Sequence, residues 1–262
     1  MTKALFFDVD GTLVDHRAGI VRVPDEVVRE IRRVQALGHK TFLSSGRPLC
    51  MIRDDLWAVG FDGMVLCNGG QVELGGRTVY AERMGVEAAR RGAAILTAEG
   101  MQYHIDASHH IFVQRDFAEA RWHLRHVEDC LTLDFDRAYA FERAIKLECF
   151  PPDDIRARLH VRAARECGDL LVVGDNGTRR AFELYSPQLS KARGISVVLD
   201  QLGIAPQDAY AFGDGENDLD MFALCGTAVA MGNAVPAAKA AADIVCGRIE
   251  DGGLASILRE LF

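Results

Sequence analysis

The chain has 262 residues, of which 49% are hydrophobic and 26% charged, and its formal net charge is −8. That length is enough for one large domain or two smaller ones with a well-buried core, and the composition is that of an ordinary soluble globular protein. The acidic balance argues against non-specific binding to nucleic acid or to an anionic membrane, because both partners are themselves negatively charged. A local basic pocket could still bind a small anion.

The sequence predicts neither a targeting segment nor a membrane span. Its first apolar run is too short for a signal peptide, and aspartates follow at once. No stretch of 18 apolar residues occurs. The seven cysteines are scattered and never arranged as C-x-x-C, which argues against a disulfide framework or a Cys-rich zinc site. We therefore expect reduced, mostly buried thiols in a cytoplasmic protein.

Strand and helix patterns alternate at the beginning of the chain. Residues 3–7 form a buried-strand pattern, and 24–38 form an amphipathic helix pattern. Residues 40–45, 49–60 and 63–69 predict a strand, a helix and a strand. This βαβαβ succession predicts a parallel sheet with right-handed crossovers. The next pattern is a hairpin over residues 71–80 that turns at Gly75–Gly76.

The alternation resumes after residue 185. There the sequence predicts helices at 190–203, 217–226, 234–243 and 252–262, and strands at 209–214, 227–231 and 243–246. The middle of the chain is richer in Arg and His. Its helix candidates are 86–99, 116–127 and 153–166, and its strand-like runs are 111–114, 144–150, 170–174 and 181–185. We therefore predict a core formed by residues 1–82 and 186–262, with an α/β domain of residues 83–185 inserted into it.

Four polar segments fall where predicted core strands end or helices begin: "DVDGT" (8–12), "SSGR" (44–47), "SKARG" (190–194) and "GDGEND" (213–218). Ligand sites of open α/β sheets collect at such positions. The first and last segments would bring several carboxylates to one rim, where like charges repel unless a cation lies between them. These carboxylates are Asp8, Asp10, Asp214 and Asp218. An all-oxygen cluster of this kind suits a hard cation such as Mg²⁺.

The same segments supply donors for an anion, namely Ser45, Lys191 and Asn217. A carboxylate cluster with one metal and one lysine is typical of phosphoryl transfer, in which one aspartate can be the nucleophile. Other interpretations of the segments fail. Neither aspartate-rich loop has the glycine and glutamate that a calcium loop needs, and Asp218 stands where a dinucleotide-binding turn needs its third glycine.

In order and spacing, the four segments resemble the motifs of the haloacid dehalogenase (HAD) superfamily of phosphohydrolases. The continuations "TAVAMGNAVPAAKAAADIV" (227–245) and "EDGGLASIL" (250–258) resemble its Cof-type branch. The resemblance implies an α/β fold, with a doubly wound, mostly parallel, Rossmann-type core. It also implies that the insertion at 83–185 is an α/β cap that determines substrate specificity.

The resemblance implies a role for each acidic residue and for the lysine. Asp8 would be the nucleophile and a metal ligand. Asp10 would be the general acid and then the general base, with its backbone carbonyl facing the metal. Lys191 would neutralise phosphate charge and hold Asp8. Asp214 would be the second side-chain metal ligand, with Asp218 a ligand through water or a brace.

The phosphate would be held by the second and fourth motifs. Ser45 would bind a phosphate oxygen, helped by the backbone N–H groups of Val9 and Gly46. Ser44 is the alternative if the register is shifted by one residue. Asn217 would hold phosphate or orient the nucleophile.

Basic residues and histidines of the middle segment carry weaker signals. Four basic residues are candidates for contact with the organic part of the substrate, with Arg47 favoured because it adjoins Ser45–Gly46; they are Arg47, Arg115, Arg143 and Lys146. Five of the eight histidines lie between residues 104 and 126. His123 and His126 share a helix face, but no Cys or Glu completes a zinc-site spacing, so we expect surface or cap-interface histidines.

These patterns together predict a Mg²⁺-dependent phosphatase that hydrolyses a small phosphorylated metabolite through an aspartyl-phosphate intermediate. Sugar phosphates, flavin mononucleotide and pyridoxal phosphate fit equally well, and the motifs specify no oligomeric state. One alternative is a phosphomutase or phosphotransferase that acts on a sugar phosphate. Another is a ligand-binding module that keeps the fold without the turnover. No nucleic-acid or membrane partner is expected.

Overall fold

The structure, a computed structural model, describes residues 1–168, 172–176 and 181–262, apart from the side chains of residues 123, 126, 172–176 and 181. The chain forms two compact units. The core unit comprises Met1–Arg47, Ile52–Ala81 and Ser190–Phe262. The inserted unit comprises Pro48–Met51 and Glu82–Leu189. Pro48–Met51 lies within the range 1–82 expected for the core, yet its contacts assign it to the inserted unit.

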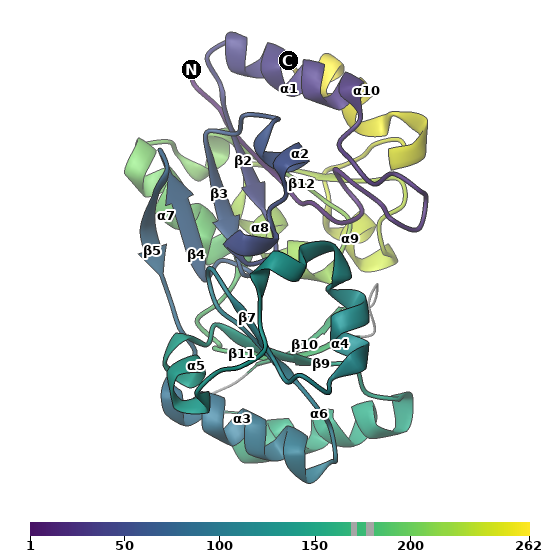
Figure 1. Cartoon of the computed structure of the whole chain (residues 1–262). Helices are drawn as coiled ribbons and strands as arrows, with labels where there is room; N and C mark the ends of the chain where they lie inside the picture. The colour runs from purple at the N-terminus through teal and green to yellow at the C-terminus, as the bar shows by residue number, and fades with distance from the viewer. Residues whose placement is uncertain (169–171, 177–180) are drawn as a thin grey trace. The chain divides into compact units, whose positions relative to one another are not determined.

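The core unit is built on an eight-stranded sheet with the order β14-β13-β12-β1-β2-β3-β4-β5 (Figure 1). The strands from β14 to β3 are parallel, and β4 and β5 add antiparallel strands at one edge. All four residues of β1 are fully buried, as expected for a central parallel strand covered on both faces. The strands are β1 (Ala4–Phe7), β2 (Lys40–Ser44), β3 (Gly63–Leu66), β4 (Gln71–Leu74), β5 (Arg77–Ala81), β12 (Ala209–Gly213), β13 (Thr227–Ala230) and β14 (Ile244–Val245).

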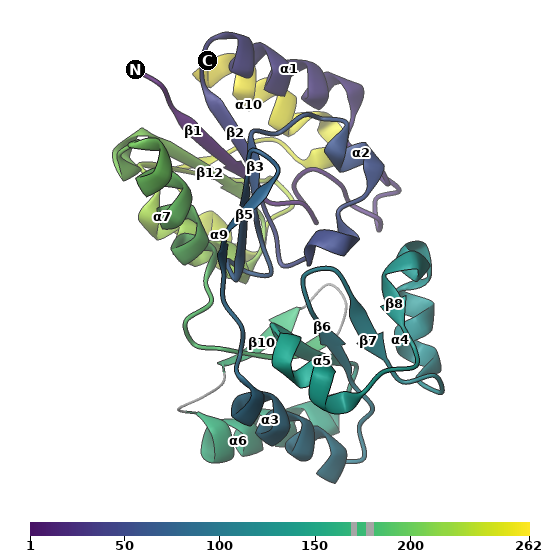
Figure 2. The ribbon, with the colours of Figure 1, turned by 60° about the vertical axis from the view of Figure 1, so that its left-hand side comes forward.

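Helices cover both faces of this sheet. In Figure 2, α1 and α10 lie side by side on one face with α2 near them, and α7 and α9 lie on the other. In α1, Val27, Ile31 and Val34 recur at helical spacing and are buried. The helices are α1 (Asp25–Ala36), α2 (Asp54–Trp57), α7 (Lys191–Leu202), α8 (Leu219–Leu224), α9 (Pro236–Ala241) and α10 (Gly253–Leu261). The layers confirm the predicted doubly wound, mostly parallel α/β core.

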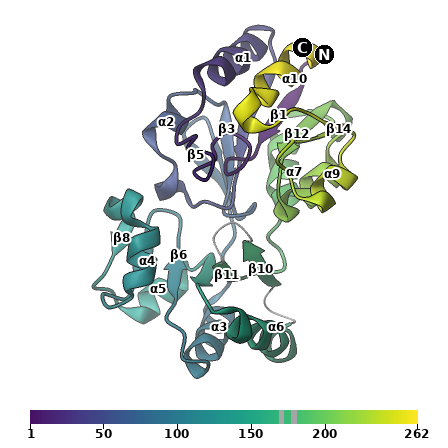
Figure 3. The ribbon, with the colours of Figure 1, turned by 90° about the vertical axis from the view of Figure 1, so that its right-hand side faces the viewer.

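The inserted unit has its own six-stranded sheet, with the order β10-β11-β9-β6-β7-β8. Its strand pairs are antiparallel except for β7 with β8. Helices α3 and α6 lie side by side along one face (Figure 3). The elements are α3 (Val86–Ala98), β6 (His104–Asp106), β7 (Ile111–Val113), α4 (Ala118–His123), β8 (Leu131–Thr132), α5 (Arg137–Arg143), β9 (Lys146–Cys149), α6 (Asp153–Cys167), β10 (Val172–Asn176) and β11 (Ala181–Tyr185).

The two faces of the inserted sheet differ in chemistry. Side chains such as Ile105, Leu147 and Phe182 pack with α3, α5 and α6 into one apolar cluster. The opposite face is apolar at β7, where Ile111 and Val113 pack with α4. Over β6, β9 and β11 this second face carries buried charged residues instead, namely His104, Asp106, Lys146, Glu148 and Glu183.

Several elements differ from the sequence-based expectation. The single helix expected at 49–60 is broken into a 3₁₀ turn at Leu49–Met51 and the short α2, because Arg53 is extended (φ −79°, ψ 164°). The helix expected at 116–127 ends at His123, and Val127 is non-helical (φ −136°, ψ 37°). Elements β6, β8 and α5 were not predicted. Part of the strand-like run 170–174 lies outside the described residues.

Two further features bear on the sequence-based expectations. No helix within the described ranges is both long enough and apolar enough to cross a membrane. Four of the seven cysteines are buried, in agreement with the expectation of mostly buried thiols: Cys67, Cys149, Cys167 and Cys225.

Candidate active site

The candidate site begins where β1 and β12 end beside each other. Phe7 pairs in parallel register with Phe212, and the backbone N–H of Asp8 donates to the Phe212 carbonyl at 2.9 Å. Asp8 and Asp214 each follow the last residue of their strand. Because the two strands are parallel neighbours, both carboxylates come to the same edge of the sheet.

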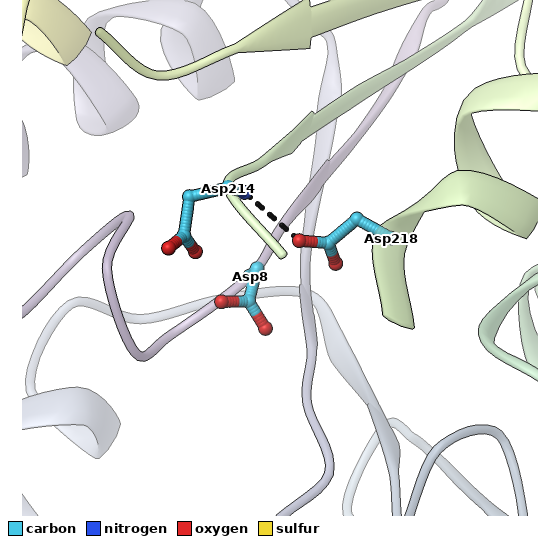
Figure 4. A group of neighbouring side chains, drawn as sticks. All are labelled: Asp8, Asp214 and Asp218. Atoms are coloured by element: carbon cyan, nitrogen blue, oxygen red, sulfur yellow. Dashed lines mark hydrogen bonds between the residues drawn. The ribbon is translucent and has the colours of Figure 1, made fainter. Parts of the chain in front are cut away.

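Three carboxylates gather at this edge. Asp8, Asp214 and Asp218 each place an oxygen within 4.8 Å of the others (Figure 4). Asp218 belongs to a 3₁₀ turn, Glu216–Asp218, that leads into α8. Gly11 makes room for this cluster, because a Cβ there would lie 2.1 Å from Asp214 Oδ2. Its φ of +94° also favours glycine.

A buried lysine compensates part of this negative charge. Lys191 is the first residue of α7, and its Nζ donates to Asp8 Oδ1 and to Asp218 Oδ1, each at 2.5 Å. The other oxygen of Asp218 accepts the backbone N–H groups of Asp214 and Gly215, both at 2.9 Å. Both oxygens of Asp218 are therefore engaged within the chain, which favours its role as a brace.

The single positive charge of Lys191 does not offset the effect of burial on the pKa values of the neighbouring carboxylates. Burial raises the pKa of Asp8 to about 7, against the opposing effect of Lys191. Burial, with the charges of Asp8 and Asp218, raises the pKa of Asp214 to about 8. Burial alone would lower the pKa of Lys191, but the carboxylates of Asp218 and Asp8 raise it, so Lys191 remains an ammonium. A cation between Asp8 and Asp214 would favour their ionised forms.

The second motif forms a loop after β2. The backbone N–H of Ser45 donates to Val65 O at 2.8 Å, and Ser45 Oγ accepts the backbone N–H of Arg47 at 3.2 Å. Cys67 and Asn68, which follow β3, donate their backbone N–H groups to the carbonyls of Arg47 and Ser45, both at 3.0 Å. Both residues have positive φ, 53° and 52°, which is uncommon outside glycine. The hydrogen bonds of these two residues thus hold the Ser45 loop against the turn that follows β3.

Asn68 is a candidate site residue that the sequence analysis missed. It is buried, and no group of the described residues donates a hydrogen bond to its Oδ1. That atom lies 3.0 Å from the position of a Cβ on Gly46, next to the predicted phosphate loop. The sequence analysis placed Asn68 and Gly69 at the end of the strand expected at 63–69 and assigned no role to either residue. Ser44 is likewise fully buried, and within the described residues its Oγ has no hydrogen-bond partner.

Asp10 and Arg47 form an ion pair that the sequence did not predict. Arg47 Nε donates to Asp10 Oδ2 at 2.9 Å, and Nη2 donates to Oδ1 at 2.6 Å. Burial would lower the pKa of Arg47, but the Asp10 carboxylate raises it, so the guanidinium stays charged. The side chain of Asp10 therefore faces Arg47, and a contact of its backbone carbonyl with a metal stays a prediction.

The remaining candidates are dispersed. Val9, which follows Asp8 in the chain, is buried, whereas Asn217, which precedes Asp218, is exposed. In the inserted unit, Arg115 pairs with Asp134, Arg143 pairs with Glu142, and Lys146 belongs to the buried charged face. Their contact with substrate stays a prediction, and the side chains of the two histidines considered for zinc, 123 and 126, lie outside the described residues.

Two further residues, Thr12 and Asn233, contact the segments that carry the acidic cluster. Thr12 Oγ1 lies 3.5 Å from Asp214 Oδ1. Asn233 Nδ2 donates to the Gly11 carbonyl at 2.7 Å, and its Oδ1 accepts the backbone N–H of Ile249 at 3.1 Å. Asn233 lies in the segment 227–245 that carried the Cof-type resemblance, but no role was predicted for it.

Comparison with known proteins fits this arrangement. Residues 5–258 match the family model described as haloacid dehalogenase-like hydrolase. The chain is 31% identical to YkrA of Bacillus subtilis (strain 168), provisionally named a phosphatase, over 99% of this chain and 98% of that protein. This chain belongs to the haloacid dehalogenase-like hydrolase family.

Other members extend the comparison. A phosphoglycolate phosphatase of Methanopyrus kandleri is 27% identical, over all of this chain and 97% of the relative. The crystal structure of a haloacid dehalogenase-like hydrolase from Bacteroides thetaiotaomicron superposes with a TM-score of 0.87 at 21% identity, with both chains fully covered. The predicted family and fold are confirmed. The family and its phosphatase-named relatives also support the prediction of a phosphatase enzyme that acts on a phosphorylated substrate.

Proposed function

We propose that this HAD-family enzyme is a Mg²⁺-dependent phosphatase that hydrolyses a small phosphorylated metabolite through a phosphoaspartate at Asp8. The observation that carries the proposal is the buried Asp8 carboxylate, held by Lys191 at 2.5 Å and clustered with Asp214. One oxygen of Asp8 accepts a hydrogen bond from the Lys191 ammonium, and the other oxygen would attack phosphorus. Nucleophilic catalysis by a carboxylate is one established way to divide phosphoryl transfer into two easier steps.

The donor set at this edge fits a hard divalent cation. Asp8 and Asp214 offer carboxylate oxygens, and the family resemblance assigns a third oxygen to the Asp10 backbone carbonyl. Among the described residues, the cluster contains carboxylates alone. Mg²⁺ prefers a few such oxygens together with water and phosphate. Burial raises the pKa of both Asp8 and Asp214, and the charge of Asp8 adds to the shift at Asp214, so a bound cation would favour their ionised forms. When bound, Mg²⁺ would neutralise charge on the transferring phosphoryl group.

The residues divide the chemistry into two displacements. In the first, an Asp8 oxygen forms a bond to phosphorus, the P–O bond to the leaving group breaks, and the proton of the Asp10 carboxyl goes to the leaving oxygen. In the second, the Asp10 carboxylate takes a proton from water as that water attacks phosphorus. The bond between phosphorus and Asp8 then breaks, releasing phosphate and the free carboxylate. Lys191 and Ser45 would hold the phosphoryl oxygens during both steps.

The substrate class is a small phosphate monoester, and the inserted unit is our candidate for its specificity cap. Phosphoglycolate joins sugar phosphates, flavin mononucleotide and pyridoxal phosphate among the compounds to test, because relatives of similar length carry the name phosphoglycolate phosphatase. A phosphomutase is the main alternative. It would return the phosphoryl group from Asp8 to another hydroxyl rather than to water.

A phosphate-release assay on such a panel tests the proposal. The wild-type chain with Mg²⁺ should release one inorganic phosphate per ester consumed, and Asp8→Asn should be inactive. Transfer to a second position of the substrate without free phosphate would favour the phosphomutase. Absence of turnover with every ester would favour the ligand-binding module.

A further inference from the structure

The contact between Arg47 and Asp10 has the geometry of a clamp. Two donors of one guanidinium meet the two oxygens of one carboxylate, at 2.9 and 2.6 Å. Such a planar two-point contact fixes both the position and the plane of a carboxylate, which a single hydrogen bond does not. The Arg47 side chain is 4% exposed, whereas that of Asp10 is 34% exposed. The buried partner is therefore placed to restrain the more exposed one.

Arg47 is itself anchored by the phosphate loop. Its backbone N–H donates to Ser45 Oγ at 3.2 Å, and its carbonyl accepts the N–H of Cys67 at 3.0 Å. Asp10 lies in the loop after β1, where its backbone also forms a short bridge with Val14. A partly exposed aspartate side chain has several staggered rotamers available. The ion pair holds the Asp10 side chain in one rotamer and fixes its position relative to the loop that contains Ser45.

We propose that Arg47 is a positioning residue, which holds the Asp10 carboxyl group in the orientation for proton exchange with the leaving oxygen and with water. This inference rests on the proposed phosphatase function. It differs from the sequence-based expectation that Arg47 contacts the organic part of the substrate, because two of its donors are directed at Asp10. Misplacing a reacting group by about 1 Å can cost about 100-fold in rate.

A double-mutant cycle separates these two roles. The variants are Arg47→Lys, Asp10→Asn and the double variant, and the probes are p-nitrophenyl phosphate and an alkyl phosphate that the wild type hydrolyses. Lysine keeps the charge but cannot make the two-point contact. Arg47→Lys should lower kcat on the alkyl ester about 10- to 100-fold, within the ~10²–10⁴-fold range of general acid–base catalysis. KM should change little, and the aryl ester, whose leaving group needs less protonation, should lose less.

The decisive result is the loss of additivity. If Arg47 acts through Asp10, then Arg47→Lys should cost less than about twofold in the Asp10→Asn background, because contributions through one group do not multiply. Arg259→Lys is the matched control. Arg259 also pairs with a carboxylate, Glu30 at 3.1 Å, but its side chain is half exposed, and its activity should equal that of the wild type. Melting temperatures of all variants would be measured so that rates are compared on folded protein.

Three outcomes would overturn the inference. A raised KM with the same fold-loss in both backgrounds would mean that Arg47 binds substrate. An unchanged kcat in Arg47→Lys would mean that the clamp is not needed. Equal losses on aryl and alkyl esters would mean that the proton transfer is not what Arg47 supports. A wild-type chain that hydrolyses no phosphate ester would instead overturn the proposed function itself.

Discussion

Removing the charge of Lys191 tests whether the acidic cluster is held together by that residue. In Lys191→Met the side chain keeps a similar length but loses both of its 2.5 Å contacts, with Asp8 and with Asp218. The Lys191 side chain is 0% exposed, so solvent cannot replace it. Removing one partner of a buried ion pair typically costs about 3–5 kcal/mol. We expect a loss of that size in the free energy of unfolding when a chelator is present.

The pH and metal dependence of this loss identify its cause. Asp8 and Asp214 already have pKa values of about 7 and 8, so the variant should lose most at pH 8 and progressively less as acid protonates the carboxylates. Mg²⁺ should restore part of the stability, by about 2.7 kcal/mol at 100 times its Kd.

Urea unfolding of the wild type and the variant measures these differences. Lys3→Met is the matched control, because Lys3 also pairs at 2.5 Å, with Asp208, but both side chains are partly exposed. The control should lose little. If Lys191→Met lost no more than Lys3→Met at pH 8 in chelator, the cluster would not depend on the lysine, and our electrostatic account of the site would be wrong.

Three more outcomes are expected. Activity should vanish in excess chelator and return with Mg²⁺, and activity that survives chelation would refute the metal requirement. Ca²⁺ should inhibit, because its longer and looser coordination misplaces the phosphate. After reaction with a ³²P-labelled aryl phosphate, Asp10→Asn should retain label on the protein and Asp8→Asn should not; stable label on Asp8→Asn would reverse the two assignments. His104 has its pKa raised to about 9: burial opposes the shift, and the Asp106 carboxylate outweighs it. The contribution of protonated His104 to the stability of the protein should therefore be fully present below pH 6.5 and lost as the pH rises through about 9. The difference in free energy of unfolding between wild type and His104→Gln, measured by urea unfolding, should shrink over that range.

The parts of the fold that could be predicted are those with a strong local pattern. The strand that ends at Phe7 and the helix with Val27, Ile31 and Val34 are each specified by a few neighbouring residues. The break inside residues 49–60 could not be predicted in this way. Met51 packs into the cluster of the inserted unit, so contacts with residues far along the chain decide its conformation, and a periodic pattern does not record them.

The same distinction applies to the site. The acidic residues and the lysine were found because each lies at a strand or helix end within a recognisable motif. The partner of Asp10 was not, because Arg47 is 37 residues away and only the folded loops bring the two together. Asn68 was missed for a similar reason, since its significance lies in an unsatisfied buried oxygen. No sequence spacing indicates such an atom.

The two aspartates of the first motif show how neighbouring carboxyl groups can take different tasks. Asp8 is buried and meets a single ammonium through one oxygen, which leaves its other oxygen as the nucleophile. Asp10 is a third exposed and meets a guanidinium through both oxygens, so it is oriented but open to solvent. A residue that forms a covalent bond needs a desolvated oxygen, whereas one that exchanges protons in turn with a leaving group and with water needs access to water. Two neighbouring carboxyl groups commonly take different catalytic roles because their environments differ in burial and in charged partners. Their different partners, Lys191 and Arg47, therefore support the order of roles proposed here, with attack by Asp8 and proton transfer by Asp10.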